Sequence, residues 1–170
     1  MQAPRLTPIS YIVLGLIEQV GEATPYQLKR LVERSVGYFW SVQHAQLYSE
    51  PERLAQAGYL HVEREESGRR RKRYSITESG RGALDAWRSQ PPAELAEMRE
   101  PALLKLFFGA DRQMLAREQL KAHAARLAEY ERIRLRIPDE VDQAPRLALD
   151  AGIRHEHEWI RYWEDVAEST

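Results

Sequence analysis

The chain contains no cysteine among its 170 residues. Disulfide bonds, thiolate zinc sites and cysteine nucleophiles are therefore excluded. No apolar run is long enough to span a membrane, because Ser10 and Tyr11 interrupt the apolar stretch from Ile9 to Ile17. No small-residue cleavage site follows a basic start, so this stretch predicts a core helix and not a signal peptide. We expect a soluble, cytoplasmic protein that does not enter a membrane.

Motifs for catalysis and metal binding are missing as well. The sequence has no glycine-rich phosphate loop and no nucleophile elbow. His155 and His157 come nearest to a metal site, but residues two positions apart on a helix point about 200° from each other. The zinc-protease spacing of two histidines four residues apart does not occur. We expect no enzyme activity, no bound metal and no cofactor.

The expected fold is mainly α-helical with a small β-hairpin. Thr7 and Thr24, each followed by a proline, are helix-start signals, and Gly21 and Gly37 end the two helices that they open. A third helix is predicted over residues 41–58.

Pro51 lies inside this third helix. Together with Leu47 and Leu54 it has the helical spacing of an inward face. Proline removes a backbone donor, so we expect it to kink or split the helix there. Residues 41–48 would then be the part that faces a partner.

A hairpin and a fourth helix are predicted next. Alternating apolar and polar residues indicate one strand over residues 59–62 and another over 74–76, and Ser67-Gly68 supplies the turn between them. Thr77 then caps a helix that includes Trp87.

The segment Gln90-Pro91-Pro92 breaks this pattern and predicts a boundary between two domains, residues 1–90 and 91–170. The first domain has the element order of a winged helix-turn-helix. The second reads as a helical dimerisation domain. A short apolar helix is expected within residues 94–108, and longer helices over 111–137 and 146–167.

Charge is distributed unevenly between the halves of the chain. The net charge is −1, but residues 1–88 carry a net charge of +3 and residues 89–170 a net charge of −4. Five consecutive cations, Arg69 to Arg73, lie at the turn of the predicted hairpin. Such a run is often only a solvated surface. Here it follows a plausible recognition helix, so we favour contact with the phosphates of DNA.

The polar face of the third helix predicts contact with base edges. Glutamine and arginine can make bidentate contacts with adenine and guanine, although a solvated helix face is the alternative. The candidate DNA-binding residues are Tyr26, Gln27, Ser41, Gln43, His44, Gln46, Tyr48, Arg53, Arg69, Arg70, Arg71, Lys72 and Arg73.

The last two helices carry apolar stripes that predict a homodimer. A helical hairpin on its own would not bury both stripes, and palindromic DNA sites favour two-fold proteins. The alternative is packing of these stripes onto the first domain. The candidate dimerisation residues are Leu120, Leu127, Ile153, Trp159, Ile160, Trp163 and Val166.

The chain resembles the PadR family of bacterial transcriptional regulators. The matching segments are ISYIVLGLIEQVGEATPYQLKRLV, FWSVQHAQLYSEPERLAQAGYL and RKRYSITESGRGAL, and EPALLKLFFG resembles the start of the C-terminal part in the virulence-activator-like subgroup. Tyr48 matches the family's tyrosine in the recognition helix and Gly58 its helix-ending glycine, whereas Pro51 stands where many members have leucine.

The resemblance implies a winged-helix domain, a dimerising helical domain and repression of a nearby promoter at a palindromic operator. Some members of the family sense phenolic acids or flat hydrophobic drugs. Trp40 and Trp87 are candidates to stack on a small aromatic effector, with a core role as the alternative.

A winged helix that contacts another protein in place of DNA is the rival hypothesis. It calls for a neutral recognition surface, and the cationic hairpin argues against it.

Overall fold

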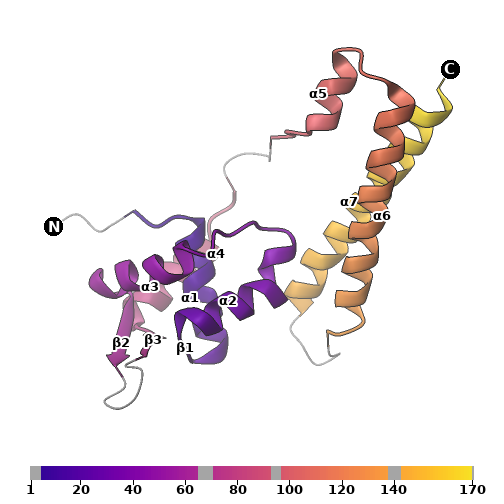
Figure 1. The fold of residues 1–170 in the computed structure, drawn as a ribbon. Helices are drawn as coiled ribbons and strands as arrows, with labels where there is room; N and C mark the ends of the chain where they lie inside the picture. The colour runs from indigo at the N-terminus through magenta and orange to yellow at the C-terminus, as the bar shows by residue number, and fades with distance from the viewer. Residues whose placement is uncertain (1–4, 65–70, 93–96, 138–142, 170) are drawn as a thin grey trace. The chain divides into compact units, whose positions relative to one another are not determined.

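The computed structural model describes residues 5–64, 71–92, 97–137 and 143–169. Within these ranges the chain is mainly helical with a small antiparallel sheet, which confirms the expected fold class (Figure 1). It divides into two compact units, Met1–Glu94 and Leu95–Thr170. No helix in the described ranges is both long and apolar enough to cross a bilayer.

The helices and strands follow one another in a simple order. Their bounds are α1 Pro8–Val20, β1 Glu22–Ala23, α2 Pro25–Arg34, the 3₁₀ turn η1 Val36–Tyr38, α3 Gln46–Gln56, β2 Leu60–Arg64, β3 Lys72–Ile76, α4 Glu78–Arg88, α5 Pro101–Phe107, α6 Arg112–Arg134 and α7 Gln143–Glu168.

Threonine caps open three helices of the first unit, as predicted. Thr7, Thr24 and Thr77 are the N-caps of α1, α2 and α4, and the hydroxyl of Thr77 accepts a hydrogen bond from the Gly80 amide at 3.1 Å. Gly21, in a left-handed conformation at φ +82°, ends α1. The caps fix where these three helices begin, and Gly21 fixes how the chain leaves α1. Helix α2 ends at Arg34 and not at the predicted Gly37, which lies within η1.

The three strands form one sheet in the order β1-β3-β2. Both neighbouring pairs are antiparallel, with Leu60 opposite Ile76 and Val62 opposite Tyr74 in the hairpin. Tyr74 and Ile76 point into the core, as the alternation of the sequence predicted. The turn at Ser67-Gly68 lies outside the described residues.

The core of the first unit joins the helices to the inner face of this sheet. The side chains buried there include Val13, Leu14 and Ile17 of α1, Leu28 of α2, Leu47 and Leu54 of α3, and Leu84 of α4. Since α3 and the hairpin share this core, their outer surfaces are held in a fixed relation to each other.

The third helix begins five residues later than predicted, at Gln46 instead of Ser41. The amides of Gln46 and Leu47 bind the carbonyls of Gln43 and His44, three residues back, so this segment is a turn. Val42 packs against the core and fixes the turn in place.

Pro51 was predicted to kink or split this helix, and the split does not occur. Helix α3 runs through Pro51 to Gln56, and the proline ring is fully buried. Only one backbone hydrogen bond, to the carbonyl of Leu47, is lost. Core packing of Leu47 and Leu54 on either side holds the helix together.

In the second unit α6 and α7 lie side by side along their length (Figure 1). Their core contains Ala102, Leu115, Ala116 and Trp163, with Tyr130, Leu149 and Ile153 buried further along the pair. Helix α7 starts three residues before the predicted Arg146, because Pro145 fits within a first helical turn.

Candidate nucleic-acid interface

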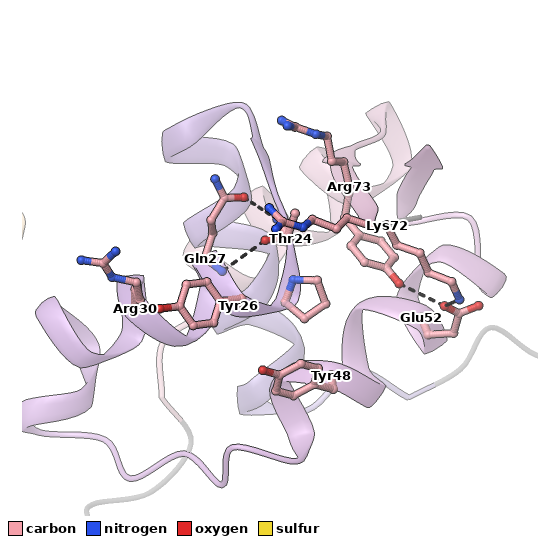
Figure 2. Close-up of a pocket in the computed structure, with 11 residues that line it drawn as sticks. Thr24, Tyr26, Gln27, Arg30, Tyr48, Glu52, Lys72 and Arg73 are labelled. Atoms are coloured by element: carbon pink, nitrogen blue, oxygen red, sulfur yellow. Dashed lines mark hydrogen bonds and ion pairs between the residues drawn. The ribbon is translucent and has the colours of Figure 1, made fainter. Parts of the chain in front are cut away.

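A groove of about 820 Å³ lies on the first unit where three elements meet. Helix α2 contributes its first turns, α3 its outer face and β3 its start (Figure 2). The lining residues are Thr24, Pro25, Tyr26, Gln27, Arg30, Tyr48, Glu52, Arg71, Lys72, Arg73 and Tyr74. Six of the candidate residues from the sequence are therefore brought together here.

The first turn of α2 is built around a reciprocal cap. The Thr24 amide donates to Oε1 of Gln27 at 2.8 Å, and the Gln27 amide donates to the Thr24 hydroxyl at 3.3 Å. The oxygen of Gln27 is thus used to hold the helix start. Tyr26, next to it, is 61% exposed and faces the groove (Figure 2).

The outer face of α3 presents Gln46 and Tyr48 to solvent. Tyr48 is 52% exposed and lies across the groove from Tyr26 (Figure 2). Ser41, Gln43 and His44 are exposed too, but they belong to the turn before the helix. They lie beside the start of α3 and are not on the helix itself.

Arg53 is not part of this outer face. Its Nε donates to Glu50 at 2.9 Å, and its Nη2 donates to Glu50 at 2.6 Å and to the Ser10 hydroxyl at 3.0 Å. The Ser10 hydroxyl donates to Glu50 at 2.6 Å. The prediction that Arg53 reads bases is corrected, since its guanidinium is engaged between α3 and α1.

The carboxylate of Glu50 is the centre of this hydrogen-bond network between α3 and α1. Ser10 is fully buried and Glu50 is 7% exposed. Burial tends to raise the pKa of Glu50, but hydrogen bonds from Arg53 and Ser10 outweigh burial and hold this pKa below its usual value. The charged network therefore ties α3 to α1.

The described cations of the hairpin differ in their partners. Lys72 donates to Glu52 of α3, and Arg73 Nη1 lies 2.6 Å from Oε1 of Glu22 in β1. Arg71 is exposed. Arg69 and Arg70 lie outside the described residues.

Glu52 also binds the hydroxyl of Tyr74, which donates to it at 3.0 Å. Burial and this hydrogen bond raise the pKa of Tyr74 to about 12, so the phenol keeps its proton. Sequence reasoning missed Glu52 as a lining residue of the groove and Glu22 as the partner of Arg73. Glu52 follows Tyr48 by one helical turn, which is the signal that could have placed it beside the groove.

The two candidate effector residues do not line the groove. Trp87 of α4 is 48% exposed and stacks on Tyr11 of α1, with ring centroids 4.6 Å apart and planes at 10°. Trp40 is 46% exposed. Neither tryptophan is a core residue, which was the alternative.

The predicted dimerisation residues are mostly engaged within their own chain. Trp163 is fully buried and Ile153 is 7% exposed. Leu120, Trp159 and Val166 pack against the same cluster as Trp163. The expectation that Trp163 and Ile153 need a partner is corrected, because α6 and α7 bury them against each other. Leu127 and Ile160 are half-buried.

Other apolar side chains of the second unit are strongly exposed. Phe107 and Phe108, at the end of α5, are 82% and 77% exposed, Leu104 of α5 is 61% exposed and Met114 of α6 is 48% exposed. We call these four residues the α5 patch. Within the described residues no cluster of His, Asp and Glu could hold a metal ion.

Comparison with known proteins divides the chain as the structure does. Residues 13–86 match the transcriptional regulator PadR-like family, and residues 98–169 match the virulence activator alpha C-terminal family. The chain is 25% identical to the negative transcriptional regulator PadR of Bacillus subtilis (strain 168), over 93% of this chain and 94% of that protein.

Solved structures of the same Bacillus protein have the same fold. PadR in complex with operator DNA superimposes with a TM-score of 0.82 at 23% identity, covering 95% of this chain and 98% of that one. PadR in complex with p-coumaric acid gives a TM-score of 0.77 at 22% identity, covering 96% and 97%.

Proposed function

Because the chain belongs to the PadR-like family of transcriptional regulators, we propose that it binds palindromic operator DNA as a homodimer and represses a nearby promoter. The observation that carries this proposal is the groove, where α2, α3 and the cationic hairpin meet. Its tyrosines and cations suit a surface that touches both bases and phosphates. Such a partner lies in the cytoplasm of a bacterium, where we place the protein.

The roles of the groove's elements follow from their chemistry. Gln46, at the exposed start of α3, and Gln43 in the turn before it would read base edges. Tyr26 and Arg30 of α2, together with Arg71 at the hairpin, would contact phosphates. Arg69 and Arg70 are proposed to extend the phosphate contacts.

The α5 patch is the proposed dimer surface, in place of Trp163 and its neighbours. Burying a large apolar side chain contributes roughly 1.5–3 kcal/mol, and a two-fold axis counts each residue twice. Leu127 and Ile160, which are half-buried, stay candidates for contacts in the dimer.

A small planar aromatic compound is the proposed effector. The Bacillus relative has been solved with p-coumaric acid, a compound of this kind. The exposed side of Trp87, opposite its stack on Tyr11, is a surface on which such a ring could lie. Trp40 is the second candidate.

A titration of DNA by fluorescence anisotropy tests the proposed function. We expect tighter binding to the promoter DNA upstream of the protein's own coding sequence than to a shuffled duplex of the same composition. Equal affinities would contradict sequence-specific recognition, and no binding to either duplex would contradict DNA binding altogether.

Arg71→Ala extends this test to the hairpin. Each cation that neutralises a phosphate contributes about 0.9 to the slope of log affinity against log salt. The variant should bind both duplexes more weakly, with a slope shallower by about that amount. An unchanged slope would show that Arg71 does not touch DNA.

A further inference from the structure

Glu52 is the one carboxylate among the residues that line the groove of the described structure. Its neighbours on that surface include four cations, Arg30, Arg71, Lys72 and Arg73. A carboxylate at this place repels the phosphates that the cations attract. Its presence on a surface built for DNA therefore calls for a physical explanation.

The geometry ties Glu52 to one of these cations. The Lys72 ammonium and the Tyr74 hydroxyl both donate to Oε2 of Glu52, the latter at 3.0 Å (Figure 2). Lys72 and Tyr74 are two residues apart on β3, so they lie on the same face of the strand. Glu52 thereby joins the recognition helix to the hairpin and holds the ammonium against the helix.

The hydrogen bonds from Lys72 and then Tyr74 lower the pKa of Glu52 below its usual value. The carboxylate is therefore charged wherever the protein is near neutral pH. Glu22 holds Arg73 in a similar way from β1, with the ion pair at 2.6 Å. Both pairs are partly exposed, with side chains between 34% and 51% accessible.

We propose that Glu52 is a specificity-determining residue. On random DNA it stays paired with Lys72 and keeps this cation from the phosphates, whereas on the operator, once α3 has bound, a phosphate takes the place of Glu52. This inference rests on the proposed function. Non-specific binding depends almost entirely on phosphate contacts, and a cation that keeps its own carboxylate releases no counterion from DNA. Exposed ion pairs are weak, so a closely placed phosphate can displace Glu52.

The variant Glu52→Gln separates the two kinds of complex. On random DNA, Lys72 gains a phosphate contact, so affinity at low salt should rise roughly fivefold and the salt slope should steepen by about 0.9. On promoter DNA the contact already exists, so affinity should rise only about twofold, with the slope unchanged. The ratio of specific to random affinity should therefore fall.

Asp85→Asn is the matched control. Asp85 also forms an exposed ion pair, with Arg88 at 3.1 Å on α4, and does not line the groove. Asp85→Asn removes the same charge as Glu52→Gln, but it frees no cation that lines the groove. Both salt slopes should therefore stay unchanged in this control. If Asp85→Asn and Glu52→Gln steepen the slope on random DNA equally, net charge is the cause and the proposal is overturned.

The variant Lys72→Met tests whether Lys72 is the cation that Glu52 keeps from the phosphates. In that background Glu52→Gln should no longer strengthen binding to random DNA. A full gain without Lys72 would overturn the holding role, because Glu52 would then act by direct repulsion. Wild-type protein that binds DNA, with no change in Glu52→Gln, overturns this inference alone. Wild-type protein that binds neither duplex overturns the proposed function as well.

Discussion

Glu50 has a structural role on α3, the helix whose outer face lines the groove. It lies on α3, yet it is buried and satisfied by Ser10 and Arg53. A buried carboxylate that lost these partners would be strongly unfavourable. At the residue scale, the network decides which part of α3 faces the core and which part faces the groove.

The lowered pKa of Glu50 predicts a pH dependence of stability. A carboxyl group whose pKa is lower in the folded protein stabilises the fold above its unfolded pKa, near 4.5, and loses this contribution as pH falls through the folded pKa. Unfolding free energy of the wild type should therefore drop below about pH 4.5 more steeply than that of Glu50→Gln. Urea unfolding followed by circular dichroism measures both, and parallel pH profiles would contradict the assignment.

Trp87 carries the prediction for effector binding. Titration with p-coumaric acid should quench tryptophan fluorescence and release promoter DNA from the wild type, because a planar ring can stack on the exposed indole. Trp87→Ala should abolish both responses, whereas Trp87→Phe, which keeps an aromatic face, should retain DNA release. A full response in Trp87→Ala would rule out the stacking role.

At the scale of elements, the sequence predicted the helices and strands that local chemistry determines. Threonine caps, the left-handed Gly21 and strand alternation each act over a few residues, and each was placed correctly. The start of α3 was misplaced, since Ser41 resembles a cap but the turn through Gln43 and His44 decides where the helix begins.

Contacts between distant residues account for the errors about side-chain roles. Arginine is a residue type that often reads bases, which is why Arg53 was a candidate. One of its actual partners, Ser10, is 43 residues away in sequence, so the pairing could not be read from the local pattern. Trp163 looked unpartnered because helical periodicity cannot tell whether the facing helix belongs to the same chain. Lys72 and Glu52 are 20 residues apart, so their pairing also depends on the fold and could not be predicted from the local sequence.

The proposed contact between α3 and base edges can be tested at Gln46. Gln46→Ala should weaken binding to promoter DNA more than binding to a shuffled duplex, because a good bidentate base contact contributes about 1–3 kcal/mol of discrimination. Ser49→Ala, also on the exposed side of α3, is a control for the loss of any polar side chain from this helix. Anisotropy titrations of both duplexes measure the difference. Equal losses on the two duplexes would remove Gln46 from the base-reading set.

At the scale of the whole molecule, the two units carry different kinds of surface. The first presents a polar, cationic groove, and the second presents the apolar α5 patch. A homodimer through the second unit would give two copies of the groove, which suits a palindromic site. The buried Trp163 stabilises the second unit within its own chain.

Phe107 and Trp163 should therefore respond differently to truncation. Phe107→Ala should give folded monomers, because the side chain is exposed in the subunit and would be lost from the dimer surface. Trp163→Ala should destabilise the subunit itself by about 3–5 kcal/mol. Analytical ultracentrifugation and thermal unfolding distinguish these outcomes.

Leu135→Ala is the control for the dimer prediction. Leu135 is 86% exposed and follows the far end of α6, so its loss should leave the dimer intact. A Phe107→Ala variant that still sediments as a dimer would show that the α5 patch is not the interface.

Hydroxyl-radical footprinting of the promoter DNA tests the central claim most directly. Two grooves related by a two-fold axis should protect two patches of backbone on one face of the duplex. The centres of these patches should lie about 10 base pairs apart, or a multiple of that spacing. A single protected patch would contradict the symmetric dimer on DNA. The absence of any protection at concentrations that saturate binding would contradict recognition through the groove.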